Sequence, residues 1–232
     1  MILCIETATE ICSAALCSRE KVISLRQSDE GKSHATLLTV FIDELLREQN
    51  IKAGELEAVA VGKGPGSFTG LRIGVAVAKG LAYGSGIPLI GIDSLTSLFH
   101  GFTESDEGKK FVEPGTIFCP MIDAKRMEAY YCLFNSSGDK LSEISAGVIE
   151  NELFSAIGNE KRIIFLGGGS GKFESVIRHP GAVFISNFKL SASFLRVPAF
   201  KALKNNIFEN TITFEPFYLK DFIATKPGKK II

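Results

Sequence analysis

Apolar and polar positions divide the first hundred residues into alternating strands and helices. Short apolar runs bounded by polar residues predict strands at 2–5, 11–18, 21–28, 57–61 and 89–92. Apolar residues at helical spacing predict helices at 33–49, 69–83 and 94–99. This order of elements predicts a mixed sheet with helices on its faces.

The second half of the chain follows a similar plan in a smaller form. Residues 104–110 (ESDEGKK) are the most polar stretch and predict a linker, so we expect two units, 1–103 and 104–232. The second unit has predicted strands at 116–122, 127–134 and 163–166 and predicted helices at 173–178 and 199–205. Its fewer helices and shorter segments indicate a reduced copy of the same α/β arrangement.

The charge of the chain is balanced overall but not along its length. Its 232 residues include 26 Lys and Arg and 26 Asp and Glu, whereas binding to nucleic acid draws on an excess of basic residues. The balance argues against a protein that binds nucleic acid by itself. Residues 1–116 hold 11 basic and 15 acidic groups, residues 117–232 hold 15 and 11, and a short basic tail begins at Lys220. We expect any contact with nucleic acid to come from the second half.

Cysteine and histidine are placed in ways that do not predict a metal site. The five cysteines form no CxxC pair and four lie in apolar runs, so we expect reduced thiols in a core. His34, His100 and His179 are far apart in sequence and form no HExxH pair. The N-terminal MILCIETATE lacks the basic segment of a signal peptide, and no apolar run reaches the roughly 18–20 residues that cross a bilayer. We therefore expect a cytoplasmic protein with no membrane segment.

Glycine is concentrated at one predicted strand-to-helix turn. Nine of the 23 glycines lie between Gly62 and Gly91, and the densest part is GKGPGSFTGLRIG at 62–74. This segment has neither the GxxxxGK[ST] order nor the GxGxxG spacing of phosphate-binding loops, and the chain contains no GxSxG nucleophile turn. Two interpretations stay open: backbone amides that bind an anion at the helix start, or a tight turn with no ligand.

The helix predicted after this turn has one smooth face. Gly70, Gly74 and Ala78 recur every four residues, and each glycine within a helix costs about 1 kcal/mol relative to alanine. The pattern predicts close packing, either against the sheet or against a second subunit. Arg72 and Arg126 are candidate anchors for a phosphate or carboxylate, with surface ion pairs as the alternative.

Two carboxylates end predicted strands at equivalent positions of the two units. Glu6 ends the first strand of the first unit and Asp123 ends the first strand of the second, which indicates a cleft between two related lobes. A second glycine run follows the strand at 163–166. Glycines there either let a nucleotide lie against the backbone or make a strand-to-helix turn.

Several segments together resemble the TsaB (YeaZ) family, bacterial subunits for the threonylcarbamoyladenosine modification of tRNA. They cover almost the whole chain: ILCIETA, KSHATLL, GPGSFTGLRIG, DAKRMEAYY and the closing FEPFYLK. GPGSFTGLRIG is highly specific, and the others add moderate support. The resemblance implies an α/β, actin/Hsp70-like (ASKHA, ribonuclease H-like) fold of two lobes with mixed sheets and a reduced second lobe.

The resemblance also implies a non-catalytic subunit that works with partners. Such subunits scaffold and activate a TsaD-like catalytic subunit, are joined by a TsaE-like ATPase, and form homodimers when TsaD is absent. The complex uses ATP and threonylcarbamoyl-adenylate to modify N6 of adenosine 37 in tRNAs that read codons beginning with A. This chain would then meet tRNA mainly through the complex. It would need no cofactor or metal of its own, and any binding of ATP or ADP would be weak.

The family's subunit interface carries over onto the helices predicted from Ser33 and Thr69. The candidate interface residues are His34, Leu37, Leu38, Phe41, Leu45, Gly70, Arg72, Ile73, Gly74, Val77 and Ala78. A remnant of a nucleotide site would comprise Glu6, Thr7, Gly167, Gly168 and Gly169. The chain departs from the family where Glu6-Thr7-Ala8 replaces Asp-Thr-Ser and where DAKR replaces the commoner DARR. The HxEGH-type metal motif of TsaD-like proteins is also missing.

Two other functions stay open at this point. A stand-alone ATP-dependent enzyme or chaperone of the actin/Hsp70 type would bind and turn over ATP without partners. A metallopeptidase would need metal ligands and a base, which the scattered histidines do not supply.

Overall fold

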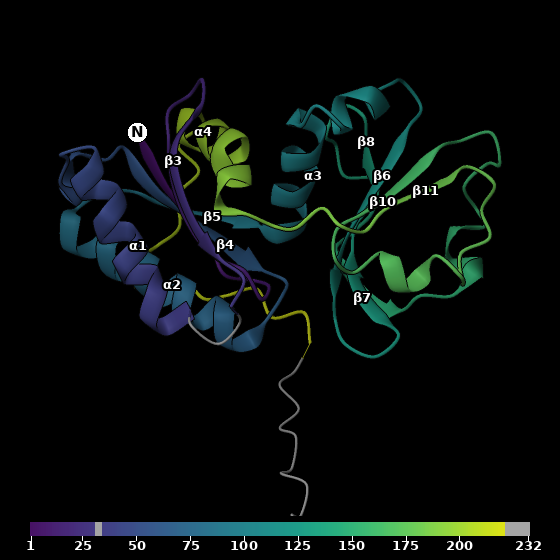
Figure 1. Cartoon of the computed structure of the whole chain (residues 1–232), viewed down its shortest axis with the longest axis horizontal. Helices are drawn as coiled ribbons and strands as arrows, with labels where there is room; N and C mark the ends of the chain where they lie inside the picture. The colour runs from purple at the N-terminus through teal and green to yellow at the C-terminus, as the bar shows by residue number, and fades with distance from the viewer. Residues whose placement is uncertain (31–33, 221–232) are drawn as a thin grey trace, which may run out of the picture.

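The computed structural model describes residues 1–30 and 34–220. Two mixed β-sheets lie side by side, each at the centre of one lobe (Figure 1). The helix cap predicted at Ser33 and the part of the basic tail that follows Lys220 lie outside the described residues.

The sheet of the first lobe has five strands in the order β3-β2-β1-β4-β5. Its strands are β1 (Ile2–Glu6), β2 (Cys12–Cys17), β3 (Val22–Ser28), β4 (Ala58–Gly64) and β5 (Leu89–Asp93). The strand β1 pairs antiparallel with β2 and parallel with β4. Both β1 and β2 are buried along their whole length because helices cover both faces of the sheet. This explains why they appear in the sequence as continuous apolar runs.

Helices α1 (His34–Glu48) and α2 (Phe68–Ser85) pack on one face of this sheet. The other face is covered by the 3₁₀ helix η5 (Ala192–Leu195) and by α4 (Arg196–Lys204). Helix α2 begins at the cap Ser67, whose hydroxyl accepts a hydrogen bond from the Gly70 amide at 3.3 Å. It ends at Gly86, whose left-handed backbone favours glycine.

The sheet of the second lobe has the order β11-β10-β6-β7-β9, and β8 pairs with β6. Its strands are β6 (Ile117–Asp123), β7 (Glu128–Tyr131), β8 (Phe134–Asn135), β9 (Ser145–Val148), β10 (Ile163–Leu166) and β11 (Ala182–Ile185). In chain order, β6, β7 and β9 pair antiparallel, and β10 and β11 then continue parallel to β6. The first lobe uses the same scheme with β1 to β5, so the predicted reduced copy is confirmed.

The second lobe is smaller because its connections are too short for long helices. Two 3₁₀ helices, η3 (Asn151–Phe154) and η4 (Gly171–Phe173), stand where the first lobe has α1 and α2. The α-helix predicted at 173–178 is wrong: glycines before this stretch and His179-Pro180-Gly181 after it leave one 3₁₀ turn. Two further 3₁₀ helices are η1 (Ala53–Glu55) and η2 (Gly108–Phe111).

The chain crosses between the lobes twice. Helix α3 (Ser94–Glu104) follows β5 directly and packs its aromatic residues against the second sheet, where the Phe99 ring lies 4.8 Å from that of Phe134. After β11 the chain returns, and Phe214 is buried in the core of the first lobe. The predicted division into 1–103 and 104–232 therefore differs from the arrangement observed, because residues 192–217 pack with the first sheet rather than the second.

Candidate functional site

A cleft of about 1520 Å³ lies between the two lobes. The first lobe contributes the chain after β1 and the start of α2, and the second lobe contributes the end of β6, part of β7 and the glycine turn after β10. Residues 217–220 form a further wall. Ligands of open α/β sheets bind at the carboxyl ends of strands, so this cleft is where a ligand of the fold would be expected.

Glu6 lies at the end of β1 but is buried rather than part of the cleft wall. Its Oε1 accepts hydrogen bonds from the backbone amides of Thr7 and Ala8, both at 2.9 Å. Its Oε2 has no hydrogen-bond partner within residues 1–30 and 34–220, although the side chain is only 1% exposed. Burial raises the pKa of this carboxyl to about 7. A Cβ at Gly62 on β4 would overlap the carboxylate, so Gly62 provides its space.

The smooth face of α2 packs against the end of β1. The Thr7 hydroxyl donates a hydrogen bond to the carbonyl of Gly70 at 2.8 Å. A Cβ at Gly70 would overlap the Thr7 carbonyl, and one at Gly74 would overlap the Thr7 side chain. Ala78 is buried in the same core. The sequence left open whether this face of α2 packs against the sheet or against a second subunit. The structure shows that it packs against the sheet.

This packing changes the predicted interface. Gly70, Gly74 and Ala78 are covered by their own chain, as are Leu38 and Leu45 of α1, so none of the five offers a surface to a partner. The prediction that they form a partner interface is wrong, because they are core residues that hold α1 and α2 on the sheet. His34 is also largely buried, and its Nε2 lies 3.0 Å from the Thr9 carbonyl.

The outer surface of α1 and α2 nevertheless carries exposed apolar and small residues, beside charged residues of α1 such as Asp43 and Glu44. Val40 is 47% exposed and Tyr83 is 72% exposed. Ala76, Gly80 and Gly84 form an exposed stripe on α2, and apart from neighbouring residues and the backbone of α2 itself no described atom lies within 4 Å of a Cβ built at either glycine. We call Val40, Tyr83, Ala76, Gly80 and Gly84 the outer face. The spacing of Ala76, Gly80 and Gly84 equals that of the buried Gly70, Gly74 and Ala78. The sequence pattern alone therefore does not show which of the two stripes is buried.

Five other predicted interface residues lie on α1 and α2 outside the outer face. Leu37, Phe41, Ile73 and Val77 are half-buried at the surface of the two helices. Arg72 is exposed, and its guanidinium lies 5.2 Å from the ring centre of Phe68. The structure thus keeps these five at a surface where a partner could reach them.

The glycine turn after β10 is packed closely against β6. Gly167 has a positive φ of 101°, and a Cβ there would lie 2.6 Å from the Met121 carbonyl. A Cβ at Gly169 would lie 2.7 Å from the backbone amide of Asp123. Gly168 differs, since no described atom lies within 4 Å of its Cβ position and it lines the cleft. Two of the three glycines are therefore explained by the chain's own packing.

Lys172 organises the loop after β6, a role that no pattern in the sequence predicts. Its Nζ donates hydrogen bonds to the Asp123 carboxylate and to the carbonyls of Arg126 and Glu128, at 2.5 to 2.7 Å. Burial tends to raise the pKa of Asp123, but the hydrogen bond from Lys172 and the Lys125 amide outweigh it, so the pKa lies below its ordinary value. Asp123 is therefore an anion that Lys172 already pairs.

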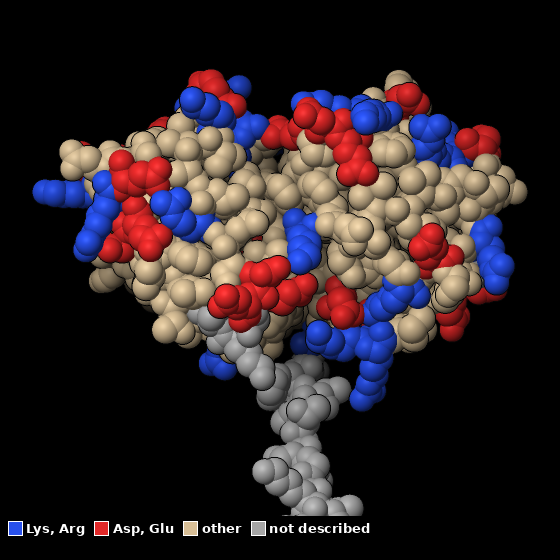
Figure 2. Space-filling model, in the orientation of Figure 1, with Lys and Arg blue, Asp and Glu red and all other residues tan. Residues whose placement is uncertain are grey.

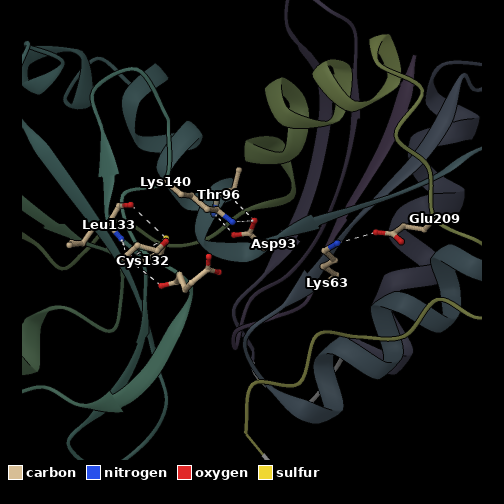
Figure 3. Close-up of polar contacts among 9 residues, drawn as sticks. Lys63, Asp93, Thr96, Cys132, Leu133, Lys140 and Glu209 are labelled. Atoms are coloured by element: carbon tan, nitrogen blue, oxygen red, sulfur yellow. Dashed lines mark hydrogen bonds and ion pairs between the residues drawn. The ribbon is translucent and has the colours of Figure 1, made fainter.

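A polar contact joins the two lobes at the start of α3. The Asp93 carboxylate caps α3 by accepting from the Thr96 amide at 2.8 Å, and Lys140 of the second lobe donates to it at 2.9 Å (Figure 3). On the other side of β5, Lys63 pairs with Glu209 at 3.0 Å (Figure 3). The contact between Asp93 and Lys140 spans 47 residues, so no local sequence pattern predicts it.

Charge is mixed over the surface. On the face shown in Figure 2, Lys and Arg side chains are interspersed with Asp and Glu over both lobes. No group of three or more His, Cys, Asp or Glu within the described ranges could hold a metal ion. No helix in the part of the chain that the structure describes is long and apolar enough to span a bilayer.

Comparison with known sequences places the chain in a family. The model of the TsaD family, tRNA N6-adenosine threonylcarbamoyltransferase, matches residues 28–226. The tRNA threonylcarbamoyladenosine biosynthesis protein TsaB of Haemophilus influenzae is 33% identical over 130 residues, which are 56% of this chain and 52% of that protein. The match thus spans about half the length of this curated relative.

Comparison with solved structures confirms the fold. A protein from Pseudomonas aeruginosa with similarity to peptidase YeaZ is 25% identical with a TM-score of 0.77, over 94% of this chain and 99% of that one. The activator of 2-hydroxyisocaproyl-CoA dehydratase from Clostridium difficile, solved with bound ADPNP, shares the fold at 10% identity and a TM-score of 0.50, over 88% of this chain and 96% of its own. The predicted actin/Hsp70-like fold is therefore confirmed. The family match shows that the chain belongs to the TsaD family, and its similarity to TsaB and YeaZ proteins confirms the resemblance to the TsaB (YeaZ) family that its sequence motifs carry.

Proposed function

We propose that this chain is a non-catalytic subunit that scaffolds and activates a TsaD-like enzyme. The modification would be threonylcarbamoylation of N6 of adenosine 37 in tRNAs that read codons beginning with A. The observation that carries the proposal is the outer face, an exposed apolar and small-residue surface on two helices that a rigid sheet supports. Exposed apolar patches of this kind mark interaction sites.

The contents of the cleft support a non-catalytic role. Of the basic side chains that line the cleft, Lys125, Lys189 and Lys220 each pair with a carboxylate of this chain, whereas Arg126 is exposed and has no ion pair among the described residues. Phosphate recognition needs donors that are available to the ligand. Gly167 and Gly169 are packed against β6, and only Gly168 of the three has an open Cβ position, which supports a weakened nucleotide site. We propose that the chain needs no cofactor and binds ATP or ADP weakly at most.

The outer face would receive the helices of the TsaD-like subunit. Small residues on a helix let a second backbone approach closely, and Val40 and Tyr83 would supply apolar area around them. In the absence of TsaD, the same face would pair with a second copy of this chain. A TsaE-like ATPase would join the complex, which would supply threonylcarbamoyl-adenylate and ATP, and tRNA would be met mainly through the complex in the cytoplasm.

A charge on the outer face tests the proposal. Gly80→Glu adds a carboxylate where no described atom crowds the Cβ, so the chain should fold while losing the partner. Gly147→Glu on β9 is the matched control, because its Cβ position is equally open in the second lobe. The measurements are co-purification with the TsaD-like subunit and tRNA modification with each subunit omitted in turn.

Two results would count against the proposal. Gly80→Glu binding the TsaD-like subunit as well as Gly147→Glu would show that the outer face is not the interface. Turnover of ATP by the chain alone would favour the stand-alone enzyme or chaperone instead, and zinc-dependent cleavage of peptides would favour a metallopeptidase.

A further inference from the structure

The segment after α4 runs along the first lobe before it reaches the cleft. The Glu209 amide donates a hydrogen bond to the Leu89 carbonyl at 2.8 Å, and its carboxylate pairs with Lys63. The Phe214 carbonyl accepts from Lys79 of α2 at 2.8 Å, and the Phe214 ring is buried in the first core. Backbone, charge and apolar contacts therefore fix this part of the segment to the first lobe.

The next residues rest on the loop that leads into α2. The Phe217 amide donates a hydrogen bond to the Lys63 carbonyl at 2.7 Å. Gly64 has a φ of 107°, and a Cβ there would lie 2.8 Å from the Phe217 carbonyl, so only glycine allows this approach. The Tyr218 ring lies 4.9 Å from that of Phe68 at the start of α2. These contacts direct the chain toward the mouth of the cleft.

Lys220 then reaches the second lobe. Its ammonium group forms an ion pair with the Glu128 carboxylate and lies 5.9 Å from the ring centre of Tyr130. Both partners are on β7. Residues 217–220 therefore contact the first lobe at one end and the second lobe at the other, and they line the cleft along the way. The yellow segment between α2 and β7 shows this path (Figure 1).

We propose that residues 217–220 form a strap that holds the second lobe against the first, with the Lys220–Glu128 ion pair as its latch. The lobes are also joined at α3, where Ala8 and Leu71 of the first lobe pack with Leu95 and Leu98. That apolar contact holds the two lobes together at α3. The strap then determines how far the lobes separate at the opposite side of the cleft. A partly exposed ion pair contributes little stability, so the latch breaks and re-forms readily.

The strap replaces a bound ligand as the link across the cleft. Domain closure in two-lobed proteins commonly depends on a ligand that contacts both lobes. Here Tyr218 contacts the first lobe and Lys220 contacts the second, so a segment of the chain itself links the two lobes. The inference concerns the lobes of a single chain and does not depend on the proposed function.

The test is the distance between the lobes in the full chain. Thr39→Cys on α1 and Val148→Cys on β9 place dyes on exposed positions of the two lobes, and the five native cysteines are buried. Single-molecule energy transfer at picomolar concentration reports one chain at a time. We expect Lys220→Ala to shift the mean separation to a longer distance. Lys204→Ala is the control, since it removes an exposed charge with no ion pair among the described residues.

Charge reversal separates the latch from a general effect on folding. Lys220→Glu and Glu128→Lys alone should each open the lobes, and the two together should restore the wild-type distance. Tyr218→Ala removes the ring contact with Phe68 at the start of α2 and should also lengthen the distance between the lobes. An unchanged separation in Lys220→Ala overturns the strap, and a doubly reversed chain that stays open overturns the ion pair as its latch.

Discussion

Glu6→Gln should make folding stability depend less on pH. The Glu6 carboxyl is buried at the end of β1, one of its oxygens lacks a partner among the described residues, and burial raises its pKa from about 4.5 to about 7. The folded chain therefore keeps the Glu6 proton at a pH where the unfolded chain has released it. Glutamine has nearly the same shape and no charge, so it removes this difference between the two states.

The size of the effect follows from the two pKa values. One unit corresponds to about 1.4 kcal/mol, so a rise from about 4.5 to about 7 gives about 3 kcal/mol. The raised pKa contributes stability that is fully present below the unfolded value of about 4.5 and is lost as pH rises to about 7. The wild type should therefore lose about 3 kcal/mol relative to Glu6→Gln between pH 4.5 and pH 7. The difference between them should then level off above about pH 8, where the Glu6 carboxyl of the folded chain is also ionised.

Urea unfolding followed by far-UV circular dichroism measures this difference, since the chain contains no Trp to serve as a fluorescent probe. Glu6→Gln will also carry a fixed cost, because a buried amide hydrogen finds no acceptor. Only the change in the difference with pH is therefore diagnostic. The exposed Glu10→Gln serves as the control. If Glu6→Gln and the wild type differ by the same amount at pH 5 and pH 8.5, the buried carboxylate is not the cause.

Three further measurements address the glycine face, the loop after β6 and the cleft. Gly74→Leu should lower stability by about 1–3 kcal/mol in thermal unfolding because its side chain overlaps Thr7, whereas Gly84→Ala on the outer face should raise it by about 0.5–1 kcal/mol. Equal effects would contradict the assignment of faces. Lys172→Met should move the pKa of Asp123 upward in an NMR titration, and an unmoved pKa would mean that Lys172 does not stabilise the anion. Titration calorimetry should give a Kd for ATP above about 1 mM, and tighter binding would show that the paired lysines can be released.

Much of the fold could be predicted because the relevant signals are local. The apolar run at 2–5 and the turn at 18–20 mark a buried strand and a hairpin without any knowledge of distant contacts. The helix predicted at 69–83 is observed as α2 (Phe68–Ser85), because the spacing of its apolar residues is also a local signal. In the second lobe, the strands predicted at 116–122 and 163–166 follow from apolar runs in the same way, whereas β9 and β11 were not predicted.

The candidate site was less predictable because its contacts join distant segments. The stripes at Gly70/Gly74 and at Gly80/Gly84 have the same spacing, and only contact with Thr7 decides which is buried. Lys172 and its carboxylate partner are 49 residues apart. A helix was predicted at 199–205, but amphipathic spacing does not specify which of two sheets it covers. Tertiary packing decides each of these cases.

The return of residues 192–217 to the first lobe has a consequence for synthesis. The second lobe is continuous in sequence from α3 to β11, so its core is available as soon as that stretch has emerged from the ribosome. The first lobe begins at the N-terminus, yet one face of its sheet stays uncovered until α4 has emerged. Domains that fold during synthesis usually do so from the N-terminus onward. This chain is arranged so that the lobe begun first is completed last, and a ribosome that stalls before α4 would leave the apolar face of β1, β2 and β4 exposed.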